Sequence, residues 1–92
     1  MIDRDSATAI ARRHLEREFP DGGVALDHGA TVETPRYWVL CYNTVAYLRT
    51  GALGDCLVGN GPLLVHKRSG TLRQAGTAHP VEHYLDEDDP AD

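Results

Sequence analysis

The sequence contains no run of about 18 to 20 apolar residues, the length that a membrane-spanning helix needs. Its first residues, Met1 to Asp5, are mostly charged and lack the apolar core of a secretion signal. We therefore expect a cytoplasmic protein that has no membrane partner.

Cysteine is scarce, with only Cys41 and Cys56 in the chain. Two cysteines are enough for one disulfide, but their spacing matches no disulfide framework. In a cytoplasmic protein we expect both thiols to stay reduced. Cys41 lies in an apolar run and is expected to act as a small buried hydrophobe.

Motifs that carry chemistry are also missing. Gly59 and Gly61 precede a predicted strand, whereas phosphate-binding loops follow a strand and open a helix. His79 and His83 have the spacing of two zinc ligands on a helix, but Pro80 between them is expected to begin the helix, and no HExxH motif is present. No local signature pairs a cysteine with a histidine as a nucleophile. We expect a protein that is not an enzyme and has no catalytic residue, cofactor or metal ligand.

Basic residues are outnumbered by acidic ones, nine to fourteen, which gives a net charge of −5. The excess comes from the last residues of the chain, and residues 1–85 are neutral without them. A neutral body without clustered Lys and Arg predicts no nucleic-acid partner. Two interpretations of the acidic end stay open, a solvated tail or a contact for a basic partner surface. The acids are Asp86, Glu87, Asp88, Asp89 and Asp92.

Ninety-two residues are enough for one domain with one modest core. The apolar fraction of 41% and the charged fraction of 25% are ordinary for a globular domain. We expect a single domain over residues 1–87 and an acidic, disordered tail over residues 88–92.

Residues 4–18 are predicted to form the first helix. Asp3, Asp5 or Ser6 is suited to accept hydrogen bonds from its first turn, and Pro20 stops it. Apolar residues recur at helical spacing and define one buried stripe. These residues are Ala7, Ile10, Ala11 and Leu15, with His14 at the edge.

Two extended segments follow. Residues 24–34 alternate, with Val24, Leu26, Ala30 and Val32 on one side, and Gly29 predicts either a bulged strand or two short strands. Residues 37–42 are aromatic and branched, and predict a central strand with Trp38, Leu40 and Tyr42 on one face. Residues 43–58 are predicted as a short turn or strand and then a loop over residues 50–55.

Residues 59–85 predict a hairpin and a closing helix. A strand over residues 63–66 is followed by a turn at Arg68 to Gly70 and a returning strand over residues 71–75. Pro80 is suited to the first position of the helix. The predicted fold class is α+β: an N-terminal helix packed on an antiparallel sheet of about four strands, with a short C-terminal helix.

This chain resembles the immunity protein 35 family, also called YrhB-like domains, over nearly its whole length to about residue 87. The combination of a Gly-Asn-Gly-Pro turn, a hydrophobic strand and a Gly-Thr-x-x-Pro helix start carries the resemblance. The matching positions are Trp38, Tyr47-Leu48, Thr50-Gly51, Gly59 to Val65, Lys67, Gly70, Gly76-Thr77, Pro80, Glu82 and Tyr84-Leu85. His66 departs from the pattern, where an acid is more usual, and we expect this to alter a surface contact and not the fold.

The resemblance implies a small cytoplasmic protein of bacterial polymorphic toxin systems, whose partner is a cognate toxin protein. It implies that the toxin is blocked by steric occlusion, without catalysis. The alternative is a chaperone-like protein with many clients, which needs an exposed apolar patch of more than a few hundred Å². Monomer and homodimer both remain open. The hypothesised partner contacts are Tyr47, Arg49, Asp55, Asn60, Asp86, Glu87 and Asp88.

Overall fold

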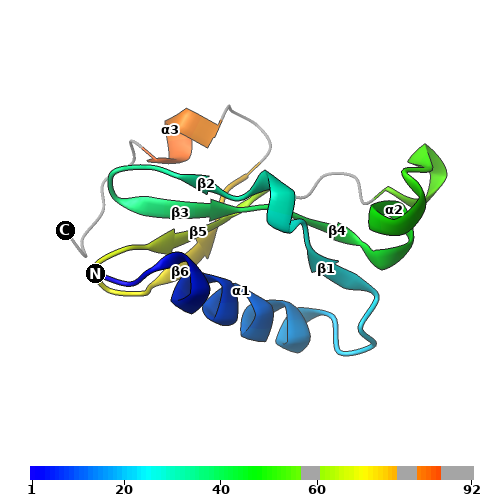
Figure 1. Cartoon of the computed structure of the whole chain (residues 1–92), viewed down its shortest axis with the longest axis horizontal. Helices are drawn as coiled ribbons and strands as arrows, with labels where there is room; N and C mark the ends of the chain where they lie inside the picture. Colours follow the sequence, from blue (N-terminus) through cyan, green and yellow to red (C-terminus); the bar gives the residue numbers. More distant parts are fainter. Residues whose placement is uncertain (57–60, 77–80, 86–92) are drawn as a thin grey trace.

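A computed structural model describes residues 1–56, 61–76 and 81–85 of the chain. Its centre is a four-stranded antiparallel sheet in the order β2-β3-β5-β6, with helix α1 beneath it and the short helix α3 on the opposite face (Figure 1). The elements are α1 (Arg4–Glu18), β2 (Val32–Glu33), β3 (Tyr37–Leu40), β5 (Leu63–His66), β6 (Leu72–Gln74) and α3 (Val81–Leu85). The predicted α+β class is confirmed.

Helix α1 has the predicted bounds because both of its ends are encoded locally. The Asp3 carboxylate accepts a hydrogen bond from the Ser6 backbone N–H at 2.8 Å, and the chain leaves the helix at Phe19, just before Pro20. Within the predicted stripe, Ala7, Ala11 and Leu15 are buried against the sheet. The two small alanines let the helix backbone approach the strands closely.

Strands β3 and β5 form the middle of the sheet and divide the core into two layers. Their register pairs Tyr37 with His66 and Leu40 with Leu63. Leu40, Trp38 and Tyr42 face α1, whereas Tyr37 and Val39 face α3, as the alternation in the sequence predicts. All residues of β5 are buried, because its two faces are covered by the two helical layers.

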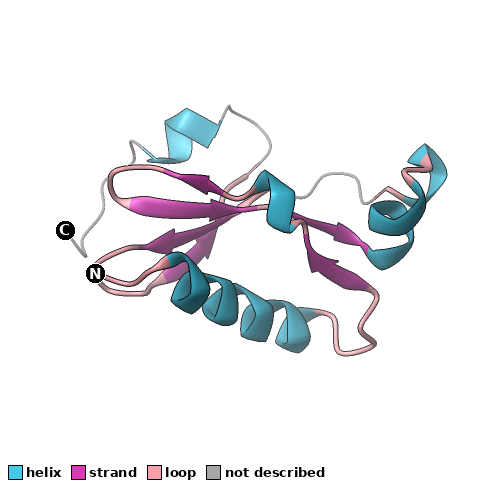
Figure 2. Ribbon diagram, viewed as in Figure 1, coloured by secondary structure: helices cyan, strands magenta, loops and turns pink. Residues whose placement is uncertain are grey.

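A two-stranded ribbon, β1 (Val24–Leu26) with β4 (Tyr42–Thr44), extends the β2–β3 pair beyond Cys41 (Figure 2). The Asp27 N–H donates to the Cys41 carbonyl at 2.9 Å and keeps the two pairs continuous. Between β1 and β2 the chain makes a 3-10 turn, η1 (His28–Ala30), so of the two alternatives, a bulged strand or two short strands, the second is correct. This turn changes the phase of the strand, so the alternation predicted from Val24 to Val32 does not continue across it: Leu26 is buried, whereas Val32 is 54% exposed.

Trp38 and Lys67, two of the positions that carry the resemblance, fasten the start of the chain to the sheet. The Trp38 Nε1–H donates to the Ile2 carbonyl at 3.2 Å, and the Ile2 N–H donates to the Lys67 carbonyl at 2.7 Å. The Lys67 Nζ lies 5.2 Å from the centre of the Trp38 ring and 2.6 Å from the Glu33 carboxylate. Lys67 is therefore a buried structural residue.

His66 is buried and does not form a surface contact, so that expectation is wrong. Its Nδ1 accepts hydrogen bonds from the N–H groups of Arg68 and Ser69, at 3.1 and 3.3 Å, and its ring packs edge-on against Tyr37 at 5.2 Å. The residue completes the turn between β5 and β6. A carboxylate is also an acceptor for two N–H groups, so the acid that the resemblance leads us to expect at this position would suit the same turn.

Glycines in the second half of the chain are required by close approach. A Cβ on Gly61 would lie 1.8 Å from the Ala75 carbonyl oxygen, and one on Gly76 would lie 2.6 Å from the Tyr84 hydroxyl. At Gly61 the chain before β5 packs closely against Ala75 after β6, and at Gly76 it packs closely against Tyr84 of helix α3. These contacts give a structural reason for glycine at both positions.

Candidate functional site

Residues 45–55 form a segment, which we call the lobe, that lies mostly exposed to solvent. It consists of helix α2 (Val45–Thr50) and the 3-10 turn η2 (Leu53–Asp55), and it lies at the far end of the β1–β4 ribbon (Figure 1). None of its residues is buried, and neither core cluster includes any of them. The lobe therefore contributes little to the core and presents most of its surface to solvent.

Helix α2 falls in the segment predicted as a short turn or strand followed by a loop over residues 50–55, and that prediction is wrong for residues 45–50. The helix is only six residues long, too short to show an apolar period. Its ends are nevertheless specific: the Thr44 hydroxyl accepts from the Tyr47 N–H at 3.0 Å, and Gly51 adopts a left-handed φ of 71° as it ends the helix. The pairing of Thr44 with Gly51 is the sequence signal that marks this helix.

Asn43 and Thr44, at the end of β4, hold both ends of the lobe. The Thr44 hydroxyl, besides capping α2, donates to the Asp55 carbonyl at the end of η2. The Asn43 Oδ1 accepts from the Thr44 N–H at 2.8 Å, and its Nδ2 lies 3.4 Å from the Cys56 sulfur. The lobe thus has a defined shape although it lacks a core of its own.

Three of the hypothesised contact residues lie in this lobe. Tyr47 is half-buried and Arg49 exposed on α2, and Asp55 is exposed on η2. The structure therefore brings together residues that the sequence placed on an undefined loop. The other hypothesised contacts fall outside the described residues: Asn60, Asp86, Glu87 and Asp88.

Leu53 was not among the hypothesised contacts. Its side chain is 83% exposed, more than that of any other large apolar residue in the described chain except Met1. The sequence signal for it is a leucine between Gly51 and Gly54, in a stretch that no apolar periodicity explains. Leu53 belongs to neither core cluster.

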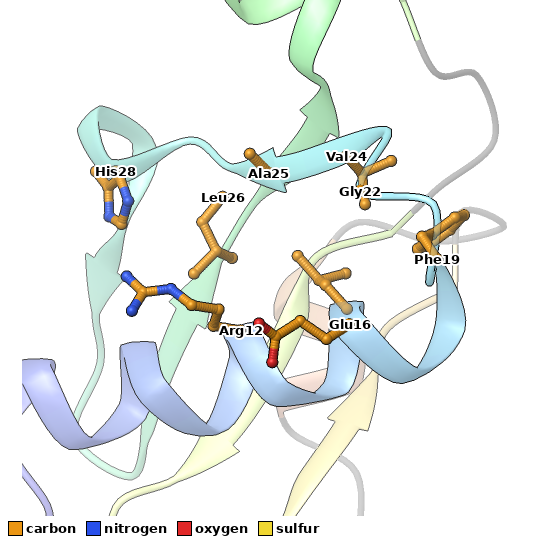
Figure 3. A pocket seen from close by; sticks show the side chains of 9 residues that line it. Arg12, Glu16, Phe19, Gly22, Val24, Ala25, Leu26 and His28 are labelled. Atoms are coloured by element: carbon orange, nitrogen blue, oxygen red, sulfur yellow. The ribbon is translucent and has the colours of Figure 1, made fainter.

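A second feature is a groove of about 270 Å³ between the end of α1 and strand β1 (Figure 3). Its apolar part is formed by Leu15, Phe19, Val24 and Leu26. At one end the Arg12 side chain points toward His28, with the Glu16 carboxylate alongside the groove (Figure 3). The groove offers space for an apolar side chain beside a charged edge.

The two cysteines are free thiols, and each is half-buried. Cys41 is thus less buried than we expected. Burial, and secondarily the nearby Asp27 carboxylate, raises the pKa of the Cys41 thiol above its ordinary value. This favours the protonated form, which is the less reactive one.

The described residues contain no group of three or more His, Cys, Asp or Glu side chains placed to hold a metal ion. Within the same residues, every helix is too short or too polar to cross a membrane.

A model of the family described as Immunity protein 35 matches residues 5–88. The chain belongs to the immunity protein 35 family. Over 48 residues it is also 40% identical to a protein of Escherichia coli (strain K12) described as "Uncharacterized protein YrhB", a match over 52% of this chain and 51% of that protein. This immunity protein 35 family member thus spans about half the length of that curated relative. No solved structure matches the chain.

Proposed function

We propose that this chain is an immunity protein that binds a cognate toxin domain and neutralises it by covering its working surface. The observation that carries the proposal is the family match over residues 5–88. The mechanism is steric and needs no catalytic residue, cofactor or metal. It requires a stable body that displays a recognition surface, and an interface of ordinary size buries about 800 Å² on each partner.

The proposed contacts begin with Tyr47, Arg49 and Asp55. Tyrosine and arginine are the residue types that, with tryptophan, most often dominate binding energy at interfaces. All three residues lie on the lobe, where binding does not disturb the core. Asn60 and the acids Asp86, Glu87 and Asp88 complete the set proposed from the sequence, and acids facing a basic toxin surface speed association in a salt-dependent way.

Capture followed by protection is the experiment that tests this function. The tagged chain is purified from cells of its source, and a stoichiometric partner with a C-terminal toxin domain is expected. That domain is then expressed in a sensitive host with and without this chain, and survival is expected only with it. Loss of viability in both cultures, or the absence of such a partner, contradicts the proposal.

The groove favours one second candidate, a chaperone-like protein that holds apolar segments of many clients. Its apolar lining is accessible from outside and is formed by Leu15, Phe19, Val24 and Leu26. The test is suppression of aggregation of reduced, unfolded lactalbumin by the wild-type chain and by Val24→Lys, which places a charged side chain in the apolar lining of the groove. Suppression that disappears in the variant supports this candidate, and no suppression by the wild type excludes it.

A further inference from the structure

We propose that the lobe inserts into a cleft of the toxin, with Leu53 as the apolar anchor at the centre of the contact. This inference rests on the proposed function, because it assigns the surface and the binding mode for the same partner. It adds a residue that the sequence analysis did not single out. It also assigns a shape to the partner's site: a concave pocket with an apolar floor.

The lobe has the form of a projection. The molecule is 39 Å long and 26 Å and 21 Å across, and the lobe occupies one end of its long axis, where the ribbon ends (Figure 2). A Cβ added at Gly51 or at Gly54 would meet no atom within 4 Å. The backbone on both sides of Leu53 is therefore open to an approaching surface.

Burial of Leu53 in an interface would remove a large apolar surface from water. Its exposure of 83% means that almost its whole side chain is available for transfer out of water. Full burial of a leucine side chain corresponds to roughly 10- to 100-fold in affinity. In the free chain the Leu53 side chain has no comparable burial.

The surroundings of Leu53 resemble the layout of a protein–protein interface. Tyr47 and Leu48 are partly exposed on α2, the helix that contacts the η2 turn carrying Leu53. The charged side chains of Arg49 and Asp55 are exposed and of opposite sign. An apolar centre with a polar rim is the arrangement that stable interfaces share.

A cleft suits this projection better than a second copy of the chain. A stable interface buries about 800 Å² per partner. Two convex lobes that meet tip to tip touch over a small area, whereas a cleft contacts the tip and all sides of one lobe. The hydrogen bonds of Asn43 and Thr44 fix the shape of the lobe before it binds, so little ordering cost opposes insertion.

The test compares two exposed apolar residues in different parts of the molecule. Leu53→Asp changes the lobe, and the matched control Val32→Asp changes the edge strand β2, where the native side chain is 54% exposed. The probe is the purified toxin domain identified by capture, and the measurement is its dissociation constant by calorimetry. Leu53→Asp is expected to weaken binding about 30-fold or more, and Val32→Asp less than about 3-fold.

Both variants are expected to unfold at the wild-type temperature, because neither native side chain lies in the core. If Leu53→Asp binds within about 3-fold of the wild type, insertion of the lobe is wrong. If Val32→Asp weakens binding as strongly, the interface lies elsewhere. If the wild-type chain itself binds no toxin domain, the proposed function fails, which is a different result.

A photo-crosslink locates the partner surface. Benzoylphenylalanine replaces Leu53 in one sample and Val32 in another, and the complex with the toxin domain is irradiated and mapped by mass spectrometry. A crosslink from position 53 to residues that line a toxin cleft supports the inference. A crosslink to a flat surface of the toxin, a crosslink to a second copy of this chain, or reaction from position 32 alone overturns it.

Discussion

The sheet with α1 and the lobe differ in what holds them in place. In β3 and β5 the residues Tyr37, Val39, Leu40, Leu63, Leu64 and Val65 are at most 6% exposed, and packing on both faces fixes them. In the lobe no residue is buried, and its shape depends on hydrogen bonds from Asn43 and Thr44 and on the left-handed Gly51. A segment held by its backbone leaves its exposed side chains free to specify a partner.

The same difference predicts two levels of stability. Opening the sheet exposes the common core, whereas opening the lobe breaks a few hydrogen bonds and exposes little apolar surface. Segments with few buried contacts open at a lower free energy than the whole domain. Three predictions test this contrast, and a fourth concerns the N-terminal cap of α1.

The largest difference in stability is expected between truncation of a leucine in the core and truncation of a leucine in the lobe. Leu64 is fully buried, and Leu64→Ala is expected to lower the free energy of unfolding by about 2–5 kcal/mol, because a cavity remains. Leu53→Ala is expected to change it by less than about 0.5 kcal/mol. Urea denaturation measures both, and comparable losses would contradict the contrast.

Two glycine substitutions give the next largest difference. Gly61→Ala places a Cβ 1.8 Å from the Ala75 carbonyl oxygen, so the strand backbones must shift, at a cost of about 1–3 kcal/mol or more. Gly54→Ala in the lobe meets no atom within 4 Å, and is expected to leave the melting temperature unchanged. If Gly61→Ala leaves the free energy of unfolding unchanged, the start of β5 and the residues after β6 are less closely packed than described.

A local effect is expected from Thr44→Val, which keeps the side-chain shape and removes both hydroxyl hydrogen bonds. Loss of a helix cap is worth about 1 kcal/mol, so amide hydrogen exchange at Tyr47 and Gly51 is expected to accelerate about 5-fold. Exchange in β5 is expected to stay at the wild-type rate. Thr8→Val is the control in α1, because the Thr8 hydroxyl bonds to the Arg4 carbonyl of its own helix. Faster amide exchange in the lobe of this variant would contradict the assignment.

The smallest effect concerns pH and the cap of α1. Hydrogen bonds to the Asp3 carboxylate, mainly from the Ser6 backbone N–H, hold the pKa of Asp3 below its ordinary value of 3.8. A pKa lowered by folding stabilises the protein above the unfolded value, and this contribution disappears as pH falls through the folded value. Asp3→Asn keeps a capping oxygen and does not titrate.

The stability difference between wild type and Asp3→Asn is therefore expected to be constant above about pH 5. As the pH falls below 3.8, the wild type is expected to lose stability relative to Asp3→Asn. Thermal unfolding at several pH values measures the difference. A difference that does not change with pH would contradict the assignment of Asp3 as an ionised cap.

Elements with local signals were predicted correctly from the sequence. Helix α1 has a cap, a stripe and a proline stop within its own residues, and β3 has a run of aromatic and branched side chains. The β5–β6 hairpin has a left-handed glycine, Gly70, at its turn, with φ of 76°. Tyr47, Arg49 and Asp55 were chosen because exposure was expected on a loop; they lie on the lobe, and their role as contacts stays a prediction.

Features with weak local signals or with distant partners were missed. Helix α2 is too short for a periodic signal and is marked only at its ends, by Thr44 and Gly51. Leu53 is marked only by the glycines around it, which do not by themselves give its exposure. His66 is buried because the β5–β6 turn closes over it and Tyr37 packs against it.

By itself the sequence determined the class of the fold, the family and the bounds of its best-marked elements, because caps, turns and periodicity act over a few residues. The tertiary structure alone decided the strand order β2-β3-β5-β6, the burial of His66 and Lys67, and the exposure of Leu53. The physical reason is that burial is a property of a side chain together with everything that packs around it, and those neighbours come from distant parts of the chain.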